Sequence, residues 1–164
     1  MIMHELARKH FERILSELRC VGAWEECPYY PCHQEHQDCT WCFCPFYPCE
    51  DECTGGKWKT TSQGTRIWDC SHCIWIHRSD VAARLMELLI RFGITSVDDL
   101  ERELRKRDEM RAAMSDEESM TEEKNKNENK KENKNKNKKK EGENKCNLLL
   151  IFEILKEEMP PNTD

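Results

Sequence analysis

The sequence predicts a small, metal-stapled, loop-rich domain with short strands, flanked by α-helices and followed by a disordered Lys/Asn/Glu tract and a short C-terminal helix. Three observations lead to this fold class. Ten of the eleven cysteines lie between Cys20 and Cys73. Prolines and glycines interrupt that stretch and break helices within it. On both sides of it, apolar residues recur at the spacing of amphipathic helices.

The N-terminal part of the chain divides into a helix and a cysteine-rich segment. Residues 1–20 are expected to form an amphipathic helix, and residues 21–78 a metal-binding domain. Within the latter, residues 57–59 and 65–68 are candidate strands of a hairpin. The helix expectation rests on an apolar face made of Leu6, Phe11, Ile14, Leu15 and Leu18.

Residues 79–114 are expected to be helical. Ser79 or Asp80 is a suitable N-cap for a first helix, and Gly93 is a suitable end for it. A second helix is predicted to begin at Ser96-x-x-Asp99, which has the pattern of a capping box.

Residues 115–145 are composed almost entirely of Lys, Asn and Glu and are predicted to be a disordered tether. The tail, 146–164, contains a candidate short helix. It either docks on the domain or on nothing, or it binds a partner. Because the tract cannot bury enough apolar surface to fold, we expect that removing residues 115–164 leaves the stability of the head nearly intact.

Charge and composition exclude several classes of protein. The formal net charge is −6, and the cysteine-rich segment has more acids than bases, which argues against a nucleic-acid-binding module. The N-terminal residues are too charged for a signal peptide, and the longest apolar run, 148–152, is too short to span a membrane. A cytoplasmic location is therefore expected, where clustered thiols are more often metal ligands than disulfides.

Cysteine spacing predicts metal binding. The pairs Cys39-x-x-Cys42 and Cys70-x-x-Cys73 form the simplest four-thiolate set, and we expect their sulfurs to converge. The surplus of thiols indicates a second metal or an iron–sulfur cluster. The near-repeat of residues 27–32 (CPYYPC) in residues 44–49 (CPFYPC) indicates either two similar metal knuckles or two arms around one site. A redox CxxC is the less favoured alternative, because its usual βαβ setting is absent.

The combination of CPYYPCH (27–33), DCTWCFCPFYP (38–48), GGKW (55–58) and IWDCSHCIWIH (67–77) resembles the cysteine-rich small domain family of archaea and anaerobic bacteria. The resemblance implies a bound metal, Zn²⁺ or an iron–sulfur cluster, and an association with cobalamin-biosynthesis proteins. It makes eight cysteines the favoured ligands, with Cys49, His33 and His77 as further candidates. The eight are Cys27, Cys32, Cys39, Cys42, Cys44, Cys53, Cys70 and Cys73.

Two functions compete. The favoured one is a non-enzymatic metal-binding accessory protein with structural zinc sites and a protein partner, because the sequence lacks a recognisable catalytic motif and its thiols suit closed sites. The alternative is an iron–sulfur redox or sensor module that serves an anaerobic enzyme. Two metal sites per chain are expected, with zinc favoured, while Cys20 and Cys146 are expected to be free thiols.

Overall fold

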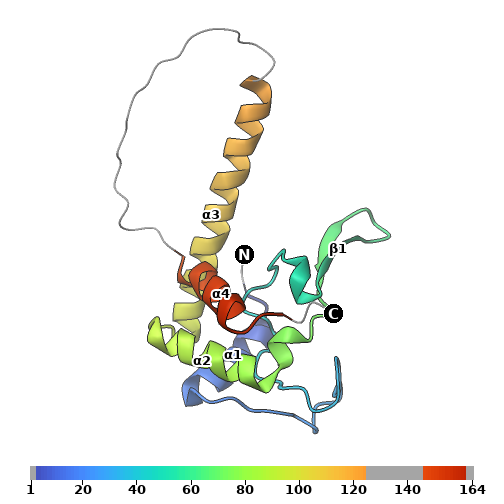
Figure 1. Cartoon of the computed structure of the whole chain (residues 1–164), viewed down its shortest axis with the longest axis vertical. Coiled ribbons are helices and arrows are strands. Elements are labelled where there is room, and N and C mark those ends of the chain that lie inside the picture. Colours follow the sequence, from blue (N-terminus) through green and yellow to red (C-terminus); the bar gives the residue numbers. More distant parts are fainter. Residues whose placement is uncertain (1–2, 125–145, 162–164) are drawn as a thin grey trace.

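The computed structural model describes residues 3–124 and 146–161 as a layer of helices with a small two-stranded hairpin beside it (Figure 1). The elements are α1 (Glu5–Glu17), η1 (Glu52–Thr54), β1 (Lys57–Thr60), β2 (Arg66–Asp69), η2 (Trp75–His77), α2 (Ser79–Arg91), α3 (Val97–Lys124) and α4 (Asn147–Glu158). The fold class expected from the sequence is thus confirmed in its elements, a small sheet and four helices with many cysteines. In the described residues, no helix is long and apolar enough to cross a membrane.

The core forms where the helices meet. In α1, the predicted apolar stripe buries Phe11, Ile14 and Leu15, whereas Leu6 stays largely exposed. α2 packs against η2 and α4, and α3 packs against α1 and α4. Leu85 and Leu100 are among the fully buried residues of this layer. The helices supply most of this core, and Trp41, Phe46, Trp75 and Ile76 of the cysteine-rich segment belong to the same cluster.

The caps of the two predicted helices differ in detail from the expectation. α2 begins at Ser79, and its N-cap is Arg78, not Ser79 or Asp80. Asp80 instead binds the Arg78 guanidinium and accepts a hydrogen bond from the Val81 amide. The expected stop is confirmed, since Gly93 has a φ of +70°, a conformation that glycine adopts without a steric penalty.

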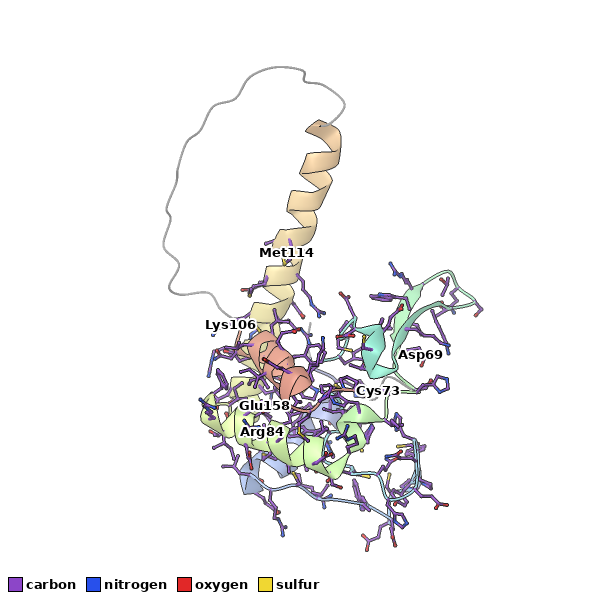
Figure 2. The ribbon with its side chains drawn as sticks, in the orientation of Figure 1. Asp69, Cys73, Arg84, Lys106, Met114 and Glu158 are labelled. Atoms are coloured by element: carbon purple, nitrogen blue, oxygen red, sulfur yellow. The ribbon has the colours of Figure 1, made fainter. Side chains whose placement is uncertain are left out.

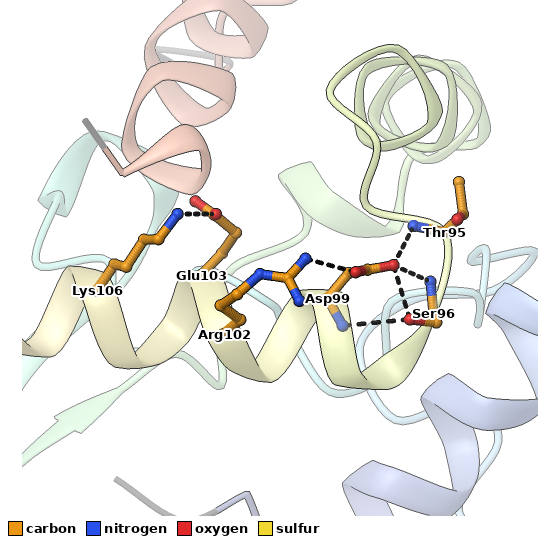
Figure 3. Close-up of polar contacts among 6 residues, drawn as sticks. All are labelled: Thr95, Ser96, Asp99, Arg102, Glu103 and Lys106. Atoms are coloured by element: carbon orange, nitrogen blue, oxygen red, sulfur yellow. Dashed lines mark hydrogen bonds and ion pairs between the residues drawn. The ribbon is translucent and has the colours of Figure 1, made fainter. Parts of the chain in front are cut away.

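The capping box at the start of α3 is confirmed (Figure 3). The Ser96 hydroxyl accepts a hydrogen bond from the Asp99 amide at 3.2 Å, and Asp99 accepts one from the Ser96 amide at 3.1 Å. Hydrogen bonds from Ser96 and Arg102 lower the pKa of Asp99 to about 2. Farther along the helix, Lys106 pairs with Glu103.

α3 continues to Lys124, which brings the first ten residues of the expected tether, 115–124, into a helix. Figure 1 shows this part of α3 extending well beyond the rest of the helical layer. The remainder of the predicted tether, residues 125–145, lies outside the described residues.

The expectation that the tail is dispensable is wrong, because α4 is a core element. Leu148, Ile151 and Leu155 are fully buried. Phe152 packs against Phe46 and Trp75, with ring centroids 4.9 and 5.8 Å apart. The apolar periodicity of residues 146–158 does not indicate which residues they pack against. Those residues lie in the sequence before the Lys/Asn/Glu tract.

The predicted hairpin is confirmed. β1 and β2 pair antiparallel, with Trp58 opposite Trp68. Gly56 is required just before β1, because a Cβ there would lie 2.5 Å from the ring of Trp68. This close approach fixes Trp68 and β2, which lead directly into Cys70.

Candidate metal centre

Eight thiols of the cysteine-rich segment divide into two groups of four. The electrostatic neighbours of the Cys42 thiol are those of Cys27, Cys32 and Cys39. The neighbours of the Cys44 thiol are those of Cys49, Cys70 and Cys73. We call the first set group 1 (Cys27, Cys32, Cys39, Cys42) and the second set group 2 (Cys44, Cys49, Cys70, Cys73). All eleven cysteines of the chain are free, with no disulfide between them.

Each group is built from the same two motifs. Group 1 joins the CPYYPC repeat at 27–32 to the CxxC at 39–42, and group 2 joins the CPFYPC repeat at 44–49 to the CxxC at 70–73. Both repeats contain a cis Tyr–Pro bond, at Tyr30–Pro31 and Tyr47–Pro48. The two groups thus have the same plan, since each combines one repeat with one CxxC.

This division differs from the pairing expected from the sequence. Cys39 and Cys42 were expected to converge with Cys70 and Cys73, but the two CxxC pairs belong to different groups. The signal that sequence reasoning missed is the order of the motifs, because each repeat is followed by a CxxC of its own.

Group 1 is arranged around the buried side chain of Gln37. Its Nε2 donates to the Cys32 sulfur at 3.0 Å and contacts the Cys39 sulfur at 3.7 Å. Its Oε1 accepts hydrogen bonds from the backbone amides of His33 and Gln34. These two bonds fix the orientation of the amide, so that its donor faces the sulfurs. Sequence reasoning missed Gln37, because a single glutamine carries no spacing signal.

Group 2 lies where the hairpin joins the helical layer, as the position of Cys73 in Figure 2 shows. The backbone amide of Phe46 interacts with the Cys44 thiol, and those of Ile76 and Trp75 interact with the Cys73 thiol. The Thr54 hydroxyl lies 3.5 Å from the Cys49 sulfur. Group 2 is thus surrounded by donors that suit an anionic sulfur.

The remaining cysteines lie apart from these groups. Cys53, one of the eight favoured ligands, is exposed on η1, and its place in group 2 is taken by Cys49. Cys146 is buried, and its thiol lies 3.4 Å from the carbonyl oxygen of Glu103. Burial raises the pKa of Cys20, whose thiol interacts with Thr40.

The two candidate histidines lie beside group 1. The Nδ1 atom of His33 is 3.3 Å from the Cys32 sulfur, and its ring stacks on His77 with centroids 4.3 Å apart. His77 is buried, and its Nδ1 lies 2.9 Å from the carbonyl oxygen of Asp38. Because that nitrogen already has a backbone partner, His77 supports the loop of group 1.

Four thiols of the two groups have pKa values above the usual value for a cysteine. Burial, followed by repulsion from Cys39 and Cys32, raises the pKa of Cys42 to about 12. Burial is also the main cause that raises the pKa values of Cys44, Cys70 and Cys73. Neutral thiols are poor nucleophiles, so the raised pKa values of Cys42, Cys70 and Cys73 disfavour thiol–disulfide exchange at the two CxxC pairs. A metal would have to displace their protons.

A cavity of about 360 Å³ lies between the two groups. Cys42 and all four thiols of group 2 line it, together with His33 and His77. Its other walls are mainly apolar and include Phe11, Trp41 and Trp68. The cavity therefore brings Cys42 of group 1 and the four thiols of group 2 to one mainly apolar space that is partly open to solvent.

The donor chemistry fits a thiophilic metal, although the side chains are not closed around an ion. Among the described side chains, no group of three or more His, Cys, Asp or Glu is arranged to hold a metal ion. The four-thiol composition of each group and the donors facing the sulfurs nevertheless match what a tetrathiolate site requires. The sulfurs of each group would have to move together on binding.

Comparison with known proteins agrees with this architecture. The family described as "Cysteine-rich small domain" matches residues 19–94. An uncharacterized protein of Methanocaldococcus jannaschii is 37% identical over 103 residues, which is 63% of this chain and 82% of that protein. No solved structure matches the chain. The chain belongs to the cysteine-rich small domain family, as expected from its motifs.

A second relative has a function in its name. A probable cobalt-factor III C(17)-methyltransferase of Methanothermobacter thermautotrophicus is 41% identical over 99 residues. The match covers 60% of this chain but 26% of the methyltransferase. The similarity is thus confined to a part of that larger protein.

Proposed function

We propose that this chain is a non-enzymatic metal-binding accessory protein that holds two Zn²⁺ ions, one in each four-cysteine group. The observation that carries the proposal is the division of eight thiols into two groups, each built from a CP-aromatic-YPC repeat and a CxxC. Four thiolates are the donor set of structural zinc sites.

In this proposal, the residues around the sulfurs stabilise four closely spaced thiolates against their mutual repulsion. A bound cation supplies the positive charge that offsets their mutual repulsion. Gln37 donates to two sulfurs of group 1, and backbone amides near Cys44 and Cys73 do the same in group 2. Such contacts spread the negative charge and hold each thiolate in position. The role of the metal is then to staple the loops of the cysteine-rich segment to the helical layer.

The alternative is an iron–sulfur module in group 2. The observation that favours it is the cavity, whose mainly apolar walls adjoin all four thiols of group 2, because low polarity around the sulfurs is one of the factors that tune a cluster. A zinc site and a cluster in group 2 would use the same four thiols. The visible spectrum distinguishes them, because Zn²⁺ has a filled d shell and is colourless, whereas iron–sulfur clusters absorb visible light.

The relation to the methyltransferase suggests where the chain acts. The matching segment accounts for about a quarter of a protein named for chemistry on cobalt-factor III. We infer that the chain is an accessory module for enzymes of cobalamin biosynthesis and that its partner is a protein of that pathway. Support comes from the name and partial coverage of this relative.

Anaerobic purification followed by elemental analysis and a visible spectrum tests the proposal. Two equivalents of zinc and a colourless protein are expected, whereas broad visible absorption with iron would favour the cluster. A matched pair of variants tests the ligand assignment. Cys49→Ser should lose the group 2 metal, whereas Cys53→Ser should keep both ions, because Cys53 lies outside the group. One equivalent or less of total metal would contradict the two-site proposal.

A further inference from the structure

We propose that the two four-cysteine groups load metal cooperatively, and that His33 is the positioning residue that couples them. This inference rests on the proposed function, since it concerns the same two groups. It adds that the first ion prepares the site for the second.

The side chain of His33 touches both groups. Its Nδ1 lies 3.3 Å from the Cys32 sulfur of group 1. The same imidazole interacts with the backbone of Cys70, which belongs to group 2. A movement of the group 1 loop on binding would therefore be transmitted to the first cysteine of the second CxxC.

A second connection runs beside the first one. The ring of His77 lies against the ring of His33. The Nδ1 atom of His77 also contacts the carbonyl oxygen of Asp38. The Asp38 amide donates to the His77 carbonyl at 2.8 Å. Asp38 precedes Cys39 of group 1, and His77, the last residue of η2, lies shortly after Cys73 of group 2. The loop of one group is thus tied to the segment that carries the other.

The two groups are also adjacent in the sequence and contribute thiols to the same cavity. Phe43 is the single residue between Cys42 and Cys44, which belong to different groups and line the same cavity. Because the sulfurs of neither group are closed around an ion, each site must contract on binding. Contraction at one site would order loops that also form part of the other site. Binding of the second ion then costs less conformational entropy than binding of the first. Coupling between sites of this kind is typically about 5- to 150-fold in affinity.

Native mass spectrometry of the reduced, metal-free full chain with one equivalent of Zn²⁺ tests the coupling. Two equal and independent sites would leave about half of the chains with a single ion, whereas positive coupling depletes that species in favour of chains with none or two. For the wild-type chain, we expect the single-ion species to fall well below half. In His33→Ala, we expect it to rise to about half or more, because both contacts of the imidazole are lost.

The matched control is His72→Ala, which removes an exposed imidazole from within the second CxxC and should leave the distribution unchanged. The Co²⁺–thiolate spectrum of each variant at saturation shows whether both sites remain intact. His33→Gln provides a second variant that retains a polar side chain and should restore part of the coupling.

The outcomes separate the two proposals. Saturation at one ion or fewer contradicts the proposed function itself. Two ions with a single-ion species at half or above in the wild-type chain overturns the coupling. Cooperative loading that persists in both His33 variants, with intact Co²⁺ spectra, overturns the assignment of His33.

Discussion

The indole Nε1 of Trp75 donates a hydrogen bond to the carbonyl oxygen of Met159 at 2.6 Å, joining η2 to the end of α4. Two other contacts strengthen the same junction. Arg84 of α2 pairs with Glu158 at 2.6 Å (Figure 2), and Lys156 pairs with Asp51 ahead of η1. The tail of the chain is therefore attached to both the helical layer and the cysteine-rich segment.

Truncating Phe152 should destabilise the protein strongly. Its ring packs against Phe46 and Trp75 and is 7% exposed. Phe152→Ala is expected to lower the free energy of unfolding by about 3–5 kcal/mol, as for other buried aromatic residues. Leu150→Ala is the matched control on the same helix. Leu150 is 44% exposed, so its loss should change stability by less than about 1 kcal/mol. Denaturant unfolding measures both, and equal effects would mean that α4 does not dock as described.

The contact between α4 and α2 should weaken in acid. The hydrogen bond from Arg84 lowers the pKa of Glu158. A carboxyl group whose pKa is lower in the folded state contributes stability above its unfolded pKa, and this contribution disappears as the pH falls through the folded pKa. Glu158→Gln should therefore be less stable than the wild type at pH 7, and the difference should vanish on acidification. Glu157→Gln serves as the neighbouring control. A difference between wild type and Glu158→Gln that does not depend on pH would rule out the ion pair as its cause.

Metal removal should affect the two parts of the chain differently. Residues 21–78 contain few aliphatic side chains, whereas the helices supply most of the buried aliphatic side chains of the core. Chelation under reducing conditions should collapse the amide NMR dispersion of the cysteine-rich segment, while far-ultraviolet circular dichroism keeps most of its helical signal. Unchanged dispersion after verified metal removal would show that metal does not hold the segment together.

Gly56→Ala should disturb group 2 through the hairpin. A methyl group at Gly56 would press on the Trp68 ring, and Trp68 lies two residues before Cys70. We expect a loss of metal from group 2, with group 1 retained. Gly64→Ala is the control, because a Cβ at Gly64 in the hairpin turn meets nothing within 4 Å. Its strained φ of +81° should cost about 1–2 kcal/mol without loss of metal. Loss of metal from both variants alike would assign the effect to hairpin stability instead.

The helices and the hairpin could be predicted because their signals are local. The stripe in α1, the Ser96–Asp99 capping box and the aromatic residues of the strands each act within a few residues of chain. The grouping of the thiols could not be predicted from the CxxC pairs alone, since Cys42 and Cys44, with one residue between them, have different thiol neighbours. Cys49 lies among the thiols of group 2 whereas Cys53 is exposed on η1, a difference that their spacing in the sequence does not reveal. The docking of α4 depends on contacts across a long stretch of sequence, which periodicity does not report.

The docking of α4 has a consequence for the order in which the protein folds during synthesis. Group 2 is complete once Cys73 has left the ribosome, whereas α4 begins at Asn147. Chains fold from the N-terminal end as they emerge, so all eight thiols of the two groups become available for metal while the faces of α2 and α3 that α4 will cover are still open to water. If the proposed function holds, metal can bind to a nascent chain before α4 is made, and Leu155 is buried only afterwards.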